Sequence, residues 1–230
     1  MALYTIGDLH LSLSVNKPMD IFGTKWKNHA ERLRENFAAL TEGDVCVLCG
    51  DSSWGMTLEE SREDFAFIDA LPGRKIILKG NHDYWWTTAK KMKDFFEANG
   101  FHSIEILNNN CFPYGENYAV CGTRGWFFEE ERGGEHDKKI MNREILRLKA
   151  SLDAAGDKEK LAFLHYPPLY QNYRCEEIIR LLQDYGVKLC CYGHIHAKGC
   201  QYAFNGWSGR TEYKLVSADF LDFAPKKIIN

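Results

Sequence analysis

The sequence has no surplus of basic residues, no long apolar run and no repeated or low-complexity segment. Its 230 residues include 29 lysines and arginines against 32 aspartates and glutamates, which gives a formal net charge of −3. Proteins that bind nucleic acid regardless of sequence usually carry a strongly basic surface. The composition therefore disfavours that class, although a local basic groove would still fit. No apolar stretch approaches the roughly 20 residues of a membrane-spanning helix, so we expect no membrane partner.

The beginning of the sequence also lacks a basic segment followed by a long apolar one, the pattern of an export signal. We therefore expect a cytoplasmic protein. No stretch has the composition of a linker, and the length suits one α/β domain with a substantial core. We predict a single domain over residues 1–230.

Eight cysteines would be enough for a disulfide scaffold, but a chain of this length does not need one. Cys46 and Cys49 have the spacing of a redox motif. In a strand, however, residues three apart point to opposite faces, so these two could not readily pair. We expect free, buried thiols.

Five strand-like runs share one feature: each is followed by side chains that commonly bind metal ions. The runs are Leu3 to Ile6, Val45 to Cys49, Lys75 to Leu78, Leu161 to Leu164, and Leu189 to Tyr192. The residues that follow them are Asp8 and His10, Asp51, Asn81 with His82 and Asp83, His165, and His194 with His196. Because ligands bind open α/β sheets at the carboxyl ends of the strands, all five ends can converge on one site.

Helical periodicity separates these strands, which predicts a layered α/β fold. The expected helices cover Trp26 to Leu40, Thr57 to Leu71 behind a capping box, Ala89 to Gly100, Asp137 (as N-cap) to Leu152, and Ile178 to Tyr185. Glu212 to Ser217 is expected to be the closing strand.

In chain order the motifs read Asp-x-His, Gly-Asp, Gly-Asn-His-Asp, His and Gly-His-x-His, and they extend from Gly7 to His196. This series resembles the calcineurin-like metallophosphoesterases. Any one motif is weak evidence, since Asp8-Leu9-His10 could be a surface turn and His165 could cap a strand. All five in order are specific. The resemblance implies an α/β fold with two packed mixed β-sheets flanked by helices, a four-layer sandwich.

The resemblance also implies a dinuclear metal centre. One ion would be held by Asp8, His10 and His196, the other by Asn81, His165 and His194, and Asp51 would bridge them. Carboxylate, imidazole and amide ligands without a thiolate suit divalent manganese, iron or zinc, and we expect manganese first. Two such ions, about 3.5–4 Å apart, lower the pKa of bound water, so that a metal-bound hydroxide can attack a phosphate ester.

Three further residues are candidates for contact with the substrate. By resemblance His82 is not a ligand and would donate to a phosphate oxygen or to the leaving group, with Asp83 orienting its imidazole. The alternative for Asp83 is a turn cap. Arg124 could hold a phosphate oxygen, or it could pair with the acidic run after it.

Phe127 to Asp137, rich in glutamate and glycine, is expected to form a mobile lid or a solvated loop.

These residues predict a metal-dependent phosphohydrolase that acts on a small phosphate ester, preferably a diester. Asp51 is followed by Ser-Ser-Trp-Gly, and residues 79–83 read Lys-Gly-Asn-His-Asp. The Ser/Thr protein phosphatases of this family have an Asp-Arg pair and Arg-Gly-Asn-His-Glu instead, which disfavours a protein phosphatase. A nuclease for single-stranded nucleic acid and a non-catalytic protein-binding scaffold are the alternatives. A scaffold should have gaps in the ligand series, and this chain has none.

Overall fold

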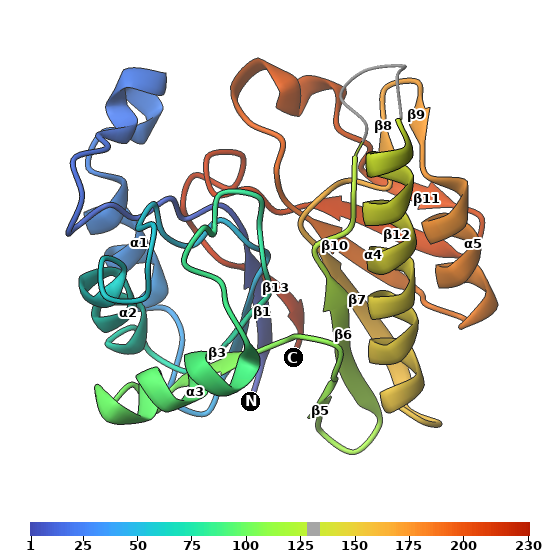
Figure 1. Ribbon diagram of the computed structural model, residues 1–230, viewed down its shortest axis with the longest axis horizontal. Coiled ribbons are helices and arrows are strands. Elements are labelled where there is room, and N and C mark those ends of the chain that lie inside the picture. Colours follow the sequence, from blue (N-terminus) through green and yellow to red (C-terminus); the bar gives the residue numbers. More distant parts are fainter. Residues whose placement is uncertain (128–133) are drawn as a thin grey trace.

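The computed structural model describes residues 1–127 and 134–230, which form two β-sheets packed against each other with helices on their outer faces (Figure 1). This confirms the predicted α/β fold of two mixed sheets. The first sheet has the order β13 (Lys226–Ile229), β1 (Leu3–Ile6), β2 (Val45–Leu48), β3 (Arg74–Ile77) and β4 (Ile104–Ile106). Only β13 runs antiparallel to its neighbour in this sheet.

The second sheet has the order β11 (Gly206–Ser208), β12 (Thr211–Leu215), β10 (Leu189–Tyr192), β7 (Glu159–Leu164), β6 (Tyr118–Thr123) and β5 (Phe112–Tyr114). Its four central strands are parallel, and β5 and β11 run antiparallel at the edges. A short hairpin of β8 (Leu169–Tyr170) and β9 (Tyr173–Arg174) stands apart. The predicted closing strand is β12, but β13 follows it and returns to the first sheet.

The helices lie close to their predicted positions. They are α1 (His29–Phe37), α2 (Arg62–Asp69), α3 (Ala89–Ala98), α4 (Glu135–Ala154) and α5 (Glu176–Asp184), with short 3-10 turns η1 (Met19–Phe22), η2 (Thr24–Trp26) and η3 (Ala197–Tyr202). Four of the five helix starts differ from the prediction: α2 begins at Arg62, five residues after Thr57, and α5 begins at Glu176, two residues before Ile178. Trp26 belongs to η2 rather than to α1, and α4 begins two residues before Asp137, with Gly134 as its N-cap. None of the helices in the described part of the chain has the length and apolar character needed to cross a membrane.

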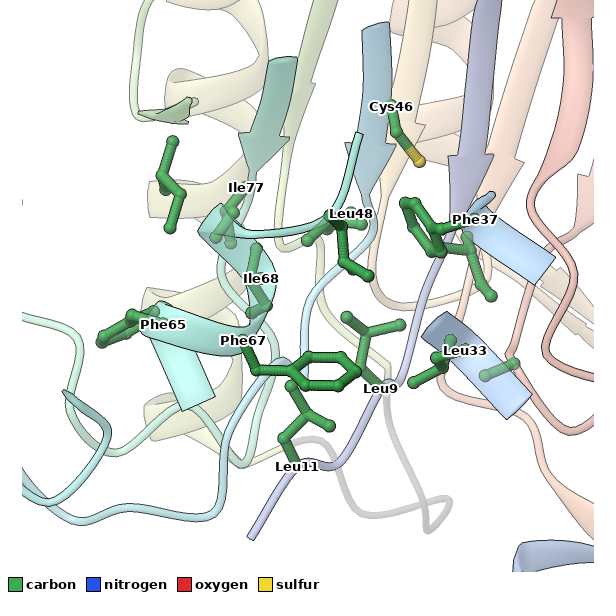
Figure 2. Close-up of a cluster of buried hydrophobic side chains, with 14 of the residues drawn as sticks. Leu9, Leu11, Leu33, Phe37, Cys46, Leu48, Phe65, Phe67, Ile68 and Ile77 are labelled. Atoms are coloured by element: carbon green, nitrogen blue, oxygen red, sulfur yellow. The ribbon is translucent and has the colours of Figure 1, made fainter. Parts of the chain in front are cut away.

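The core has three layers because the central strands are buried on both faces. One cluster packs α1, α2 and α3 on the first sheet, where Phe37, Phe65 and Ile68 cover the sheet residues Leu48 and Ile77 (Figure 2). A second cluster packs α4 and α5 on the second sheet, and a third lies between the sheets. Burial of each such leucine, isoleucine or phenylalanine contributes about 1.5–3 kcal/mol.

Side chains alternate between the two faces of a strand, and this separates Cys46 from Cys49, the pair with the spacing of a redox motif. Cys46 belongs to the cluster under the helices and Cys49 to the cluster between the sheets. All eight cysteines are free, as predicted. Burial raises the pKa of the Cys46 thiol well above its ordinary value, so this thiol stays protonated.

Lys75 is a charged residue within this core. It is fully buried on β3, and its Nζ donates hydrogen bonds to the carbonyl oxygens of Asp69, Leu71 and Gly73. These carbonyls lie at the end of α2 and in the turn that leads to β3. Lys75 therefore satisfies the backbone acceptors that the helix end leaves open.

Candidate metal centre

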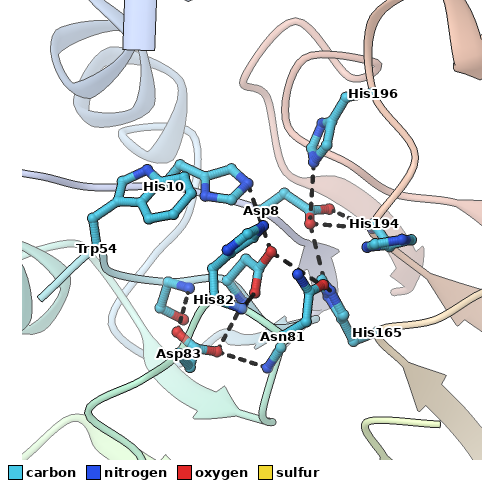
Figure 3. A network of polar contacts seen from close by, with 12 residues as sticks. Asp8, His10, Trp54, Asn81, His82, Asp83, His165, His194 and His196 are labelled. Atoms are coloured by element: carbon cyan, nitrogen blue, oxygen red, sulfur yellow. Dashed lines mark hydrogen bonds and ion pairs between the residues drawn. The ribbon is translucent and has the colours of Figure 1, made fainter. Parts of the chain in front are cut away.

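The predicted ligands gather at the carboxyl ends of five parallel strands, β1, β2 and β3 from the first sheet and β7 and β10 from the second. Figure 3 shows their side chains directed toward one region between the two sheets. Each strand stops one to four residues before its ligands, so the side chains project from the loops at this edge. The convergence predicted from the sequence is what the fold produces.

The backbone at these loops is unusual. Asp8, His10, Asp51 and His194 have positive φ angles of 59°, 47°, 53° and 72°, although none is a glycine. Such left-handed conformations cost about 1–2 kcal/mol per residue and tend to occur at functional sites. Hydrogen bonds hold the turns: the N–H of Asp8 donates to Gly50 O at 2.8 Å, and that of His10 to Asp51 O at 2.9 Å.

One compact group of potential ligands consists of Asp8, His10 and His196, whose ligand atoms lie within 4.8 Å of one another. Nε2 of His196 lies 3.4 Å from Oδ1 of Asp8. Among the described residues, neither this Nε2 nor Nδ1 of His10 has a hydrogen-bond partner, although both are buried. A metal ion bound beside Asp8 would satisfy Nε2 of His196, whereas the nitrogen of His10 that faces Asp51 is Nε2 and not Nδ1.

The outer side of His196 is held by Asp219. Nδ1 of His196 donates to Oδ1 of Asp219 at 2.9 Å, and the other oxygen accepts the N–H of Ala197 at 2.8 Å. Burial lowers the pKa of His196, but the carboxylates of Asp8 and Asp219 outweigh it and raise the pKa to about 10. Sequence reasoning missed Asp219, which lies in the turn after β12.

A second compact group consists of Asp8, Asp51 and His165. Nδ1 of His165 lies 3.0 Å from the carbonyl oxygen of Cys49 and must donate to it. Burial lowers the pKa of His165 to about 4, so the ring is neutral at pH 7 and its Nε2 carries a lone pair. That lone pair faces Oδ1 of Asn81 at 2.6 Å. Two acceptors so close together fit a shared cation, which both would bind.

Asp51 belongs to the second group and also approaches His10 of the first. Its Oδ1 accepts the N–H of His82 at 2.7 Å, while Oδ2 lies 3.7 Å from Nε2 of His10 and 3.6 Å from Nε2 of His165. One oxygen of Asp51 therefore lies almost equally far from a histidine of each group. Gly80 makes room for it, because a Cβ at position 80 would collide with the carboxylate.

His194 lies at the edge of the centre. Its ring centroid is 5.1 Å from that of His165, and its backbone N–H donates to both oxygens of Asp8, at 3.1 and 3.0 Å. Burial lowers its pKa to about 3. The second compact group contains Asp8 where the predicted set has His194, so Asp8 faces both groups.

His82 and Trp54 cover the opposite side of the centre (Figure 3). Trp54 stacks on His10 with ring centroids 4.9 Å apart, and its ring lies 4.5 Å from that of His82. Nδ1 of His82 lies 3.3 Å from the hydroxyl of Tyr84. The sequence analysis did not identify Trp54 as a residue of the site. The one feature that could have indicated it is its position three residues after Asp51.

The predicted contact between Asp83 and the His82 imidazole needs correction. The buried carboxylate of Asp83 instead accepts hydrogen bonds from the backbone N–H groups of Asp51, Ser52 and Gly80, at 2.7–2.8 Å, and from Nε1 of Trp85 at 3.0 Å. These bonds tie the loop after β2 to the loop after β3. Asp83 therefore caps a turn, which was the alternative.

Arg124 lies beside the centre rather than in either compact group. Its guanidinium is 3.5 Å from Oε1 of Glu144, and its Cζ lies 4.9 Å above the ring of Trp126. Its carbonyl oxygen accepts the N–H groups of His165 and Tyr166, at 3.1 and 2.8 Å. Arg124 therefore pairs with a residue of α4. The acidic run that the sequence offered as an alternative partner lies mainly in residues 128–133, which are outside the described part of the chain.

Most of the predicted lid, Phe127 to Asp137, lies outside the described residues, which omit 128–133. The ring of Phe127 contacts Tyr173 at 4.5 Å and lies 6.3 Å from His194. The end of the segment, from Glu135, is the first turn of α4.

Comparison with known proteins agrees with this geometry. The family model of the calcineurin-like phosphoesterases matches residues 1–198, and the chain belongs to that family. The family is metal-dependent, and the two groups of Asp and His residues could bind two ions. Among curated proteins, none matches the sequence closely enough to count as a relative.

Solved structures with a similar fold have low sequence identity. A phosphopantetheinyl hydrolase from Mycobacterium tuberculosis is 13% identical, with a TM-score of 0.63 over 99% of this chain and 95% of that one. A Thermus thermophilus protein is 12% identical, with a TM-score of 0.57 over 99% and 97%. An Aquifex aeolicus protein of unknown function is 17% identical, with a TM-score of 0.55 over 98% and 95%.

Proposed function

We propose that this protein is a dinuclear metal-dependent phosphoesterase that hydrolyses small phosphate esters, with a preference for diesters. The observation that carries the proposal is the position of Asp51, one of whose oxygens lies almost equally far from His10 and His165. The proposed first site is Asp8, His10 and His196, and the proposed second site is Asn81, His165 and His194, with Asp51 between them. When bound, two divalent ions, manganese in our proposal, supply Lewis-acid activation of water and of the phosphoryl group.

The residues around the ions have proposed roles of their own. The hydroxyl of Tyr84 lies at Nδ1 of His82 and can donate to it, which leaves the proton on Nε2. When Nδ1 also takes up a proton from solvent, with the Tyr84 hydroxyl turned to accept it, the imidazolium can transfer its Nε2 proton to the departing ester oxygen and is left neutral. Trp54 packs on His10 and His82 and limits the directions that either ring can take.

The chemical class of the substrate is supported by general features. The chain differs from the protein phosphatases after Asp51, and its net charge of −3 disfavours a nucleic-acid substrate. Eight free cysteines suit a reducing compartment, which supports a cytoplasmic location. The similarity to a phosphopantetheinyl hydrolase adds phosphopantetheinyl esters to the candidates.

A substrate panel tests the proposal. The chain, stripped of metal and reloaded with manganese, would be given an aryl phosphodiester, an aryl phosphomonoester, a phosphopantetheinyl carrier protein, a phosphoserine peptide and single-stranded DNA. We expect the highest kcat/KM on a small diester and none of this activity without metal. A higher kcat/KM on the monoester or the peptide would refute the diester preference, and turnover that survives complete metal removal would refute the metal-dependent mechanism.

A further inference from the structure

A cavity of about 400 Å³ opens at the carboxyl ends of β3, β4 and β6. Lys79 follows β3, Arg124 follows β6, and both side chains line the cavity. Helix α4, which lies alongside β6 in Figure 1, adds Glu144 and Arg147. The volume falls in the range of small-ligand sites, about 300–1,000 Å³. Of the described residues that line it, none is a predicted metal ligand.

The cavity is nevertheless a direct neighbour of the metal centre. Lys79 is two residues before Asn81 on the same loop. On the other side, the carbonyl oxygen of Arg124 accepts the N–H groups of His165 and Tyr166. Lys79 and Arg124 thus connect the wall of the cavity to the loops that carry Asn81 and His165.

The charges that line the cavity do not balance. Lys79, Arg124 and Arg147 face a single carboxylate, Glu144, which is 1% exposed. Its Oε2 accepts a hydrogen bond from Thr123, and its Oε1 pairs with Arg147 at 2.6 Å and with Arg124 at 3.5 Å. Among the described residues that line the cavity, Glu144 offsets one of three positive charges and leaves an excess of two; the carboxylate of Asp83, which also acts on Lys79, does not line it.

Two of the cations also have unused donors. Within residues 1–127 and 134–230, the ammonium of Lys79 forms no ion pair or hydrogen bond, and Nε of Arg124 is buried without a partner. The amino end of α3, with its N-cap Thr88, forms another part of the wall. A helix N-terminus adds partial positive charge and free N–H groups on that side.

We propose that this cavity, the basic pocket, binds a second phosphate group of the ester that the metal centre hydrolyses. The substrate would then carry two separate phosphoryl groups. A phosphate monoester, with a charge of about −1.5 to −2 at pH 7, matches the excess of two positive charges. A guanidinium such as that of Arg124 suits phosphate oxygens through its forked donors. This inference rests on the proposed function.

The test is a calorimetric titration of the manganese-loaded chain with alkane bisphosphonates of increasing spacer length. Each is compared with the alkyl monophosphonate of equal length. At one spacer length, we expect the bisphosphonate to bind at least about tenfold more tightly than the monophosphonate. A hydrogen bond to a charged group contributes about this much to affinity. Arg147→Met should lose most of this advantage. Arg143→Met is the matched control, because Arg143 is exposed on the same helix and does not line the pocket.

Lys79→Met is the second variant, in case loss of Arg147 beside buried Glu144 disturbs the fold, and thermal unfolding of both variants checks this. The proposal is overturned if the wild-type chain shows no bisphosphonate advantage, or if the advantage survives in both variants. Because calorimetry needs no turnover, the two proposals can fail separately. A chain that is inactive on every ester but loses its bisphosphonate advantage in Arg147→Met would refute the hydrolase and retain the basic pocket as an anion site.

Discussion

Nδ1 of His196 donates a hydrogen bond of 2.9 Å to Oδ1 of Asp219, which lies in the turn after β12. This bond directs Nε2 of His196 toward Asp8, the side on which a metal ion would bind. A carboxylate on the outer nitrogen of a metal-binding histidine fixes the ring and increases its basicity. We therefore expect Asp219 to position His196 for the ion of the proposed first site.

Replacement of Asp219 should weaken metal binding without unfolding the protein. For Asp219→Asn we expect a loss of about 10–100-fold in manganese affinity, the usual effect of removing such a partner. Titration with manganese, followed by metal analysis, measures this. Asp222→Asn, at an exposed aspartate three residues along, is the control and should bind manganese like the wild type. Equal affinities for all three proteins would contradict the assigned role.

Replacement of Asp51 should affect both ions. Metal analysis of the wild-type chain should find up to two ions, because two ligand groups are present. Asp51→Asn removes the negative charge between them, so both should bind more weakly and activity should fall with them. Chelation should abolish the activity of the wild type, and manganese should restore it best. Loss of a single ion in Asp51→Asn, with the other at full affinity, would refute the bridging position.

His82 should contribute to the reaction without holding a metal. His82→Ala should keep its metal content and lose about 10²–10⁴-fold in rate, as expected for a general acid. The loss should be greater on an alkyl ester than on a nitrophenyl ester, since nitrophenolate departs without a proton. Tyr84→Phe, which removes only the hydroxyl at Nδ1, should show a smaller loss of the same pattern. A missing ion in His82→Ala would identify His82 as a ligand instead.

The positions of the ligands could be predicted because strand ends are readable in sequence. Asp8, Asp51 and His165 each follow a run of apolar residues, and parallel strands bring such ends to one edge. The two-sheet arrangement could not be read in the same way. The central strands of both sheets are buried on both faces, so periodicity does not assign them to one sheet or the other. That part of the fold came from the family resemblance.

The partners of polar side chains were harder to predict. Asp83 is next to His82 in sequence, yet its carboxylate binds the N–H groups of Asp51 and Ser52, about thirty residues away. Asp219 lies 23 residues after His196 and has no motif around it. Such contacts depend on how loops from different strands meet, which local sequence does not specify.

Lys75 should be important for stability although it lies outside the metal centre. Lys75→Met keeps the apolar stem but leaves the buried carbonyl oxygens of Leu71 and Gly73 without a donor, whereas that of Asp69 keeps the Ser103 hydroxyl. Each unsatisfied buried group costs about 1–3 kcal/mol, so we expect unfolding to become easier by several kcal/mol. Urea denaturation of the metal-free protein measures this. Lys188→Met, which removes an exposed ion pair with Glu159, should change stability by less than about 1 kcal/mol. Similar midpoints for the two variants would refute the role of Lys75.

The candidate ligands come from the ends of strands in both sheets, so bound ions would link the two sheets to each other. The first sheet contributes Asp8, His10 and Asp51, and the second contributes His165 and His196. Neither sheet could unfold on its own without releasing metal, and a ligand that binds only the folded state stabilises it by mass action. The supply of metal would then influence the lifetime of the folded protein as well as its activity.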